Sequence, residues 1–201
     1  MNRTALALIT AASISLPGTI TNANIIVFSG NFSGAQEFPP TGSPGTGLVT
    51  VTVDDVLNTM TVDAAWANLV APTTVAHIHC CAPLGANAGV ATSVPTFPGF
   101  PAGVQSGTYN ATFDMTLASS FNPAFVTAQG GTTTSAFSAL INGMLTSNAY
   151  FNIHTSQFPG GEIRAQLAPV PEPSTWAMLL MGFAAVGLTI RRARRKVAAI
   201  A

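Results

Sequence analysis

The sequence contains few charged residues. Only 7% of its 201 residues are Asp, Glu, Lys or Arg, against about 25% in an average soluble domain. Between residues 24 and 169 the only basic residue is Arg164, which stands against six acidic residues. A segment with a single cation cannot neutralise a phosphate backbone, so the composition argues against nucleic-acid binding. The shortage of charge also excludes an architecture of solvent-exposed, ion-paired helices.

Motifs of common enzyme sites are absent as well. The chain has no Gly-x-Ser-x-Gly elbow, no glycine-rich phosphate loop and no His-Glu-x-x-His pair. Its carboxylates show no spacing that pairs them for glycoside hydrolysis. The sequence therefore favours a binding or structural role over catalysis, although residues far apart in the chain can still meet in a fold.

The first 23 residues have the features of a secretory signal peptide. Arg3 supplies a positive charge, an apolar run extends from Ala5 to Leu16, and small residues precede a cleavage site after Ala23. We expect signal peptidase to remove residues 1–23 and the mature chain to leave the cytoplasm. The alternative is a buried N-terminal helix.

The C-terminal region combines an apolar segment with a basic end. Residues 176–190 contain no charge, and as a helix they would be about 22 Å long, which is shorter than the roughly 30 Å hydrocarbon core of a bilayer. A basic cluster follows, and such clusters stay on the cytoplasmic side of a membrane. The cluster consists of Arg191, Arg192, Arg194, Arg195 and Lys196. The pattern predicts a short transmembrane helix with the body of the protein outside the cytoplasm.

A Val170-Pro171-Glu172-Pro173 tetrad lies just before this segment. The tetrad, the apolar stretch and the Arg-rich end together resemble the PEP-CTERM sorting signal of Gram-negative bacteria, which defines a third region at 170–201. The resemblance implies processing by the membrane protease-transpeptidase exosortase and an association with exopolysaccharide. It predicts an inner-membrane-anchored precursor that later reaches the cell surface or the extracellular space. An ordinary membrane helix would instead leave residues 176–201 on the mature protein.

Residues 24–169 are expected to form one β-rich domain. Apolar and polar residues alternate over several segments, which is typical of half-buried strands. Between residues 109 and 117, for example, Tyr109, Phe113 and Met115 would face the core, and Asn110 and Asp114 would face solvent. Strands are predicted at 25–32, 47–53, 59–66, 74–80, 109–117, 149–155 and 162–167.

Two other segments break the strand period. Apolar residues at 137, 140, 141, 144 and 145 predict an amphipathic helix with Thr134 or Ser135 as its N-cap and Gly143 as a weak point. Residues 83–107 contain five Gly and four Pro, which predicts a long loop. Loops of that length are often functional.

The three histidines are candidate metal ligands. His77 and His79 would project from the same face of one strand, since side chains alternate along a strand. His154 lies on another predicted strand, and a hairpin around residues 157–161 would bring Glu162 opposite it. Three imidazoles and a carboxylate suit Zn or Cu. The other interpretation, which the sequence favours, is a structural, hydrogen-bonded cluster of the same residues without metal.

Cys80 and Cys81 are adjacent and are the only cysteines. Consecutive Cα atoms lie about 3.8 Å apart across a trans peptide, below the usual range for disulfides of about 4.4 to 6.8 Å. Four states are open in an oxidising compartment: a vicinal disulfide, which we favour, thiolate ligands beside His79, links to other chains, and two inert thiols.

Four motifs follow one another in the body: FSGAQEFPP at 32–40, AHIH at 76–79, NIHT at 152–155 and PGGEIR at 159–164. In this order they resemble the CHRD domain, which is named from chordin and is widespread in bacterial exported proteins. The match runs from about residue 26 to 167 and departs from the family at Ala165, where Gly is common. The resemblance implies an all-β, immunoglobulin-like sandwich or barrel and transfers no established catalytic residue.

The ionisable residues of these motifs are expected to converge, because polar groups covered on a sheet must be paired. They would form either a polar knot, with Glu37 and Arg164 in structural roles, or a metal or ligand site beside the long loop. Two functions follow. The favoured one is a non-enzymatic surface or extracellular-matrix module that binds polysaccharide or another surface protein. The other is a Cu- or Zn-binding metalloprotein, redox-active in the manner of sandwich-type superoxide dismutases, which is an analogy of fold only.

Overall fold

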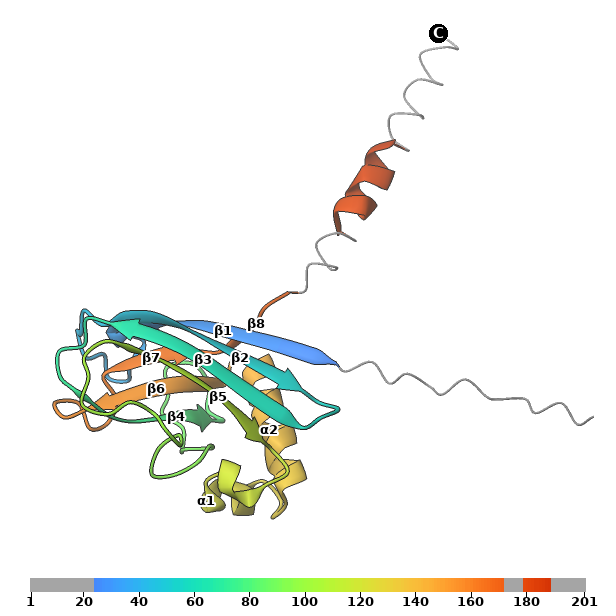
Figure 1. The fold of residues 1–201 in the computed structure, drawn as a ribbon. Helices are drawn as coiled ribbons and strands as arrows, with labels where there is room; N and C mark the ends of the chain where they lie inside the picture. Colours follow the sequence, from blue (N-terminus) through green and yellow to red (C-terminus); the bar gives the residue numbers. More distant parts are fainter. Residues whose placement is uncertain (1–23, 172–178, 189–201) are drawn as a thin grey trace, which may run out of the picture.

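The computed structural model describes residues 24–171 and 179–188 (Figure 1). The predicted signal peptide at 1–23, Glu172 and Pro173 of the tetrad, and the basic cluster at 191–196 lie outside the described residues. Residues 179–188 form a helix within the predicted membrane segment. No helix in the described part of the chain is long and apolar enough to cross a membrane. The predicted transmembrane helix is therefore not confirmed.

One antiparallel sheet of eight strands dominates the fold (Figure 1). Its strands are β1 (Ile25–Ser33), β2 (Thr46–Asp54), β3 (Thr59–Ala67), β4 (Thr73–Cys80), β5 (Gly107–Asp114), β6 (Ala149–Thr155), β7 (Ile163–Gln166) and β8 (Ala168–Pro169). They are arranged in the order β4-β6-β7-β1-β2-β3-β5, and β8 pairs with β1 off this path. The strand prediction is confirmed for all seven predicted segments, with boundaries that differ by a few residues.

The sheet curls into a half-barrel (Figure 1). The prediction of a mostly β fold with short helices is confirmed. Of the two predicted forms, a sandwich or a barrel, neither is complete, because the described strands form one continuous curled sheet in place of the two facing sheets of a sandwich. The reason lies in β7, which pairs with β6 on one side and with β1 at Ser33↔Arg164 on the other. This strand therefore joins what would otherwise be two separate sheets.

The hydrophobic core lies on one face of the curled sheet. In β3 the side chains of Met60, Val62, Ala64 and Trp66 are buried, while those between them are more exposed, as the period of two requires. On β6 the core-facing residues Phe151 and Ile153 are fully buried. Phe97, from the loop after β4, stacks on Phe151 with ring centroids 5.5 Å apart.

Two short helices, α1 (Pro123–Ala128) and α2 (Thr133–Leu145), add to this core. The helix predicted from the apolar period corresponds to α2 and buries Phe137, Leu140 and Met144. Its N-cap is Thr132, not Thr134 or Ser135, because the Thr132 side chain accepts a hydrogen bond from the Ser135 N–H at 3.1 Å. Ser135 completes a capping box from the third helical position.

Cys80 and Cys81 form a disulfide at the end of β4, joined by a cis peptide bond. Their sulfur atoms lie 3.9 and 3.7 Å from the carbonyl oxygen of Ala139 in α2. A Cβ atom at Gly143 would overlap the Sγ of Cys80 and lie 3.0 Å from that of Cys81. Gly143 is therefore more than a weak point in the helix, because its missing side chain makes room for the disulfide.

The segment between β4 and β5 is the predicted long loop, and it contains only isolated bridges. Its backbone follows the outer edge of β4. The N–H groups of Cys80, Ala91 and Phe97 donate to the carbonyl oxygens of Gly89, Ile78 and Ala76. These hydrogen bonds cover an otherwise free strand edge. The loop and the turn after β6 both contact the face of β6 that points away from the core, and every residue of β6 is buried.

Candidate metal centre

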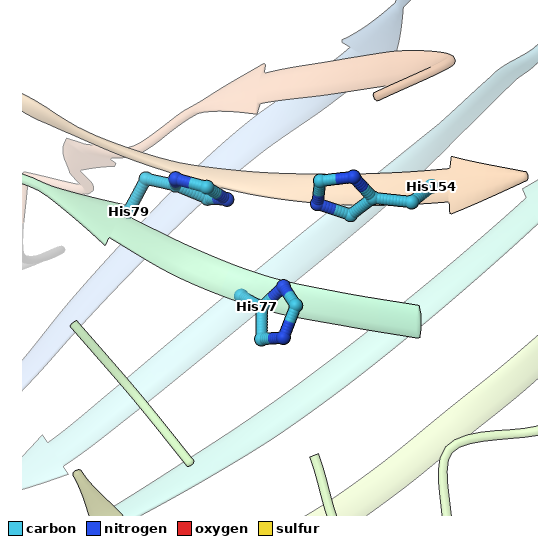
Figure 2. A group of neighbouring side chains, drawn as sticks. All are labelled: His77, His79 and His154. Carbon is cyan, nitrogen blue, oxygen red and sulfur yellow. The ribbon is translucent and has the colours of Figure 1, made fainter. Parts of the chain in front are cut away.

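Strands β4 and β6 bring the three histidines together on this covered face (Figure 2). His77 and His79 come from β4, and His154, which lies opposite Val75, comes from β6. The ring centroids are 5.3 to 5.8 Å apart. One ring nitrogen from each histidine lies within 4.8 Å of the other two. The predicted convergence of the histidines is thus present in the structure.

Each imidazole uses one nitrogen to donate a hydrogen bond to a backbone carbonyl oxygen. The pairs are His77 Nε2 with Pro95 (2.7 Å), His79 Nδ1 with Ala88 (2.9 Å) and His154 Nδ1 with Pro159 (2.9 Å). A carbonyl oxygen can only accept, so the bonded nitrogen carries the proton and the other nitrogen of a neutral ring holds a lone pair. The carbonyl groups therefore define which nitrogen of each ring is free to bind.

The remaining nitrogens have no hydrogen-bond partner among the described residues. They are His77 Nδ1, His79 Nε2 and His154 Nε2, and all three atoms are buried. The histidine side chains belong to residues that are only 5 to 8% exposed. An unpaired buried acceptor ordinarily costs about 1–3 kcal/mol. Three lone pairs gathered in one place form a donor set that suits an electron-pair acceptor such as a metal ion.

Burial lowers the pKa of all three histidines, and it lowers that of His79 to about 4. Removal from water disfavours the charged ring. The positive charge of Arg164 acts in the same direction on the pKa of His79 and His154, while the carbonyl hydrogen bonds act against it. The three rings are therefore neutral near pH 7, which is the state that binds metals.

The donor set fits a first-row transition metal. Neutral imidazole is a ligand of Zn and Cu, with bonds of about 2.0–2.1 Å. In metal sites the second ring nitrogen usually donates to a carbonyl or carboxylate, which holds the ring in position. All three histidines have that outer hydrogen bond already.

Glu162 is not part of this cluster, contrary to the prediction of a fourth ligand. Ile153 pairs with Ile163 as the predicted hairpin requires, but Glu162 precedes β7 and follows Gly161, whose φ of 127° departs from strand geometry. Side-chain alternation therefore does not extend to Glu162. Its carboxylate accepts four hydrogen bonds elsewhere, from Ser43 Oγ (2.7 Å), Thr155 Oγ1 (2.7 Å), Val70 N (2.6 Å) and Ala71 N (3.4 Å).

Glu37 and Arg164 form a buried ion pair, with 3.0 Å between Arg164 Nη2 and Glu37 Oε2. The guanidinium also donates to the carbonyl oxygen of Ala86 and to Asn87 Oδ1. Burial raises the pKa of Glu37 more than Arg164 lowers it. These contacts agree with the structural role expected for the pair.

Tyr150 links this ion pair to the histidines, and the sequence reasoning did not identify it. Its ring is stacked on His79 with centroids 4.9 Å apart, and the Arg164 guanidinium carbon lies 3.7 Å from its centroid. The Ala88 N–H donates to the Tyr150 hydroxyl at 3.0 Å. A signal was available, because Tyr150 lies on the same face of β6 as His154, four residues away.

The fold and the site define a mostly β half-barrel domain with a buried cluster of three histidines. The family model of the CHRD domain matches residues 28–167, and that of the PEP-CTERM protein-sorting motif matches residues 169–195. The chain belongs to the CHRD domain family, and both predicted resemblances are confirmed. Neither the curated proteins nor the solved structures that were compared give a match.

The sorting motif indicates an exported protein. It implies processing by exosortase, with membrane anchoring before processing and association with the cell surface afterwards. The matched motif begins at Pro169 within β8, and Val170 of the tetrad, which follows this strand, is 44% exposed.

Proposed function

We propose that the exported domain binds one transition-metal ion, zinc or copper, through His77, His79 and His154. The observation that carries the proposal is the set of three buried ring nitrogens without a partner. Each of them is an acceptor because the other nitrogen of its ring carries the proton and donates it in a hydrogen bond to a backbone carbonyl oxygen. A metal-free polar knot would give these nitrogens donors. The described part of the chain supplies none.

Metal analysis of tag-free protein tests this function. We expect one equivalent of bound Zn or Cu per chain, and a melting temperature that rises on loading and falls after chelation, because an ion that binds only the folded state stabilises it. His154→Gln should lose the metal and the chelator effect together. Absence of stoichiometric metal, with unchanged melting after chelation, would remove the proposal.

A surface or extracellular-matrix role is a second proposal, which is compatible with the first. It is supported by an open hollow of about 400 Å³ whose lining includes Glu37, Phe38, Asn87 and Phe158. The side chain of Phe38 belongs to a residue that is 54% exposed. An exposed aromatic ring beside the exposed amide of Asn87 suits a polysaccharide chain or another surface protein, because the ring contributes apolar contact and the amide fixes orientation.

Binding to immobilised exopolysaccharide tests this second role. Phe38→Ala should weaken retention several-fold, whereas Leu84→Ala, at a 77% exposed position outside the hollow, should leave retention unchanged. Equal retention of both variants and the wild-type protein would show that the hollow is not the binding surface.

A further inference from the structure

The histidine site offers three neutral ligands and no negative one. In residues 24–171 and 179–188, the group of ligand atoms that could share one ion contains no carboxylate and no thiolate. The two glutamates of the region are engaged elsewhere, Glu162 with four donors and Glu37 with Arg164. The two cysteine sulfurs are bonded to each other and packed against α2.

A divalent ion at this site would keep its full charge in a buried environment. The nearest charged side chain in the stack is Arg164, which contacts Tyr150, and Tyr150 in turn contacts His79. The negative charge of Glu37 neutralises the positive charge of Arg164 and leaves none to neutralise the metal ion. An uncompensated charge in a low-dielectric interior is costly, so the charge balance of the loaded site favours a bound anion.

The coordination count points the same way. Zinc is usually four-coordinate, and sites with three protein ligands keep their fourth position for a solvent-derived ligand or a substrate. The backbone oxygens bonded to the three rings belong to Pro95, Ala88 and Pro159. Each accepts a hydrogen bond from the ring nitrogen that points away from the other two rings. Asn152, opposite His77, carries a buried side-chain oxygen without a hydrogen-bond partner among the described residues, but this oxygen is neutral and would leave the charge of the ion uncompensated. The charge balance therefore favours a fourth ligand from solution.

We infer that the metal site takes an exchangeable small monoanion as its fourth ligand, an inference that rests on the proposed metal site. In water this anion is hydroxide or a dissolved halide or pseudohalide, exchanged by simple ligand displacement without any redox step. The histidines are 5 to 8% exposed under the loop after β4, and this burial favours anions of a few atoms over larger ones. The site thus belongs to the open, reactive type of metal centre and not to the closed structural type.

Azide titration of the copper(II)-loaded full-length protein tests the inference. In chloride-free buffer, one equivalent of copper should give a visible and an electron paramagnetic resonance spectrum that both shift on addition of azide. A new azide-to-copper charge-transfer band should saturate at one azide per copper. Benzoate, a bulky monoanion, should leave both spectra unchanged.

The possible failures are distinguishable. Copper bound one-to-one with spectra that azide in large excess does not alter would overturn the inference and leave the proposed metal site standing. Failure to bind copper or zinc would overturn both. As a control, His154→Gln and His77→Gln, checked for folding by circular dichroism, should show neither the copper signal nor the azide band. An azide band that persists in both variants would place the copper elsewhere and also overturn the inference.

Discussion

Replacing Glu162 with alanine is expected to lower the free energy of unfolding by about 3–5 kcal/mol, because several buried donors lose their acceptor and each unsatisfied buried group costs about 1–3 kcal/mol. The carboxylate accepts from the side chains of Ser43 and Thr155 and from the backbone of Val70 and Ala71. It therefore joins the segment before β2, the segment after β3 and the end of β6. All four donors would lose their acceptor in the variant.

Urea denaturation of the Glu162→Ala protein measures this effect. Asp63→Ala is the matched control, because Asp63 is an exposed carboxylate whose side-chain hydrogen bond is to Asn110. Its substitution should change stability by no more than about 0.5 kcal/mol. Equal losses in the two variants would contradict the role assigned to Glu162. Metal binding should survive in Glu162→Ala protein that remains folded, since Glu162 lies outside the histidine cluster.

Acidification of the metal-free protein from pH 7 to pH 4 is expected to cost several kcal/mol of stability. The unfolded histidines bind protons below about pH 6.5, but the folded ones have lowered pKa values, that of His79 being about 4. Below pH 6.5 the unfolded state therefore binds more protons than the folded state, and the free energy of unfolding decreases as the pH is lowered. At about 1.4 kcal/mol per pKa unit, His79 alone contributes roughly 3 kcal/mol. The raised pKa of Glu37 makes the folded protein more stable as the pH is lowered, but this is one group, whereas three histidines have the opposite effect on stability.

Denaturation curves at pH 7, 5.5 and 4.5, recorded in the presence of chelator, provide the measurement. His79→Gln, which keeps a polar side chain but does not titrate, should show a shallower loss between pH 6.5 and 4.5 than the wild-type protein. Equal stability at pH 7 and pH 4.5 would show that the histidines are not held neutral by burial.

The strands were predictable because their signal is local. Alternation in segments such as 59–66 depends only on which side chains face the core, and the structure buries Met60, Val62, Ala64 and Trp66 accordingly. The N-cap of α2 was misplaced because the apolar stripe begins at Phe137, one turn after the polar residues that begin the helix. A capping box of Thr132 and Ser135 carries no apolar signal.

The site was only partly predictable for a related reason. His77 and His79 share a face by alternation, whereas Glu162 was assigned by extending the same alternation past Gly161, where the backbone leaves the strand conformation. The contacts of Glu162 with Ser43 and Val70 span more than 90 residues. No local pattern reports contacts of that length.

The amino-acid sequence alone determined the family, the sorting motif, the mostly β class and the common face of His77 and His79, because motifs and side-chain periods are properties of neighbouring residues. Only the tertiary structure decided that β6 pairs with β4 and carries His154 to them, and that carbonyl groups of two loops turn the lone pairs of the three rings toward one another. These features depend on segments that meet through packing and backbone pairing.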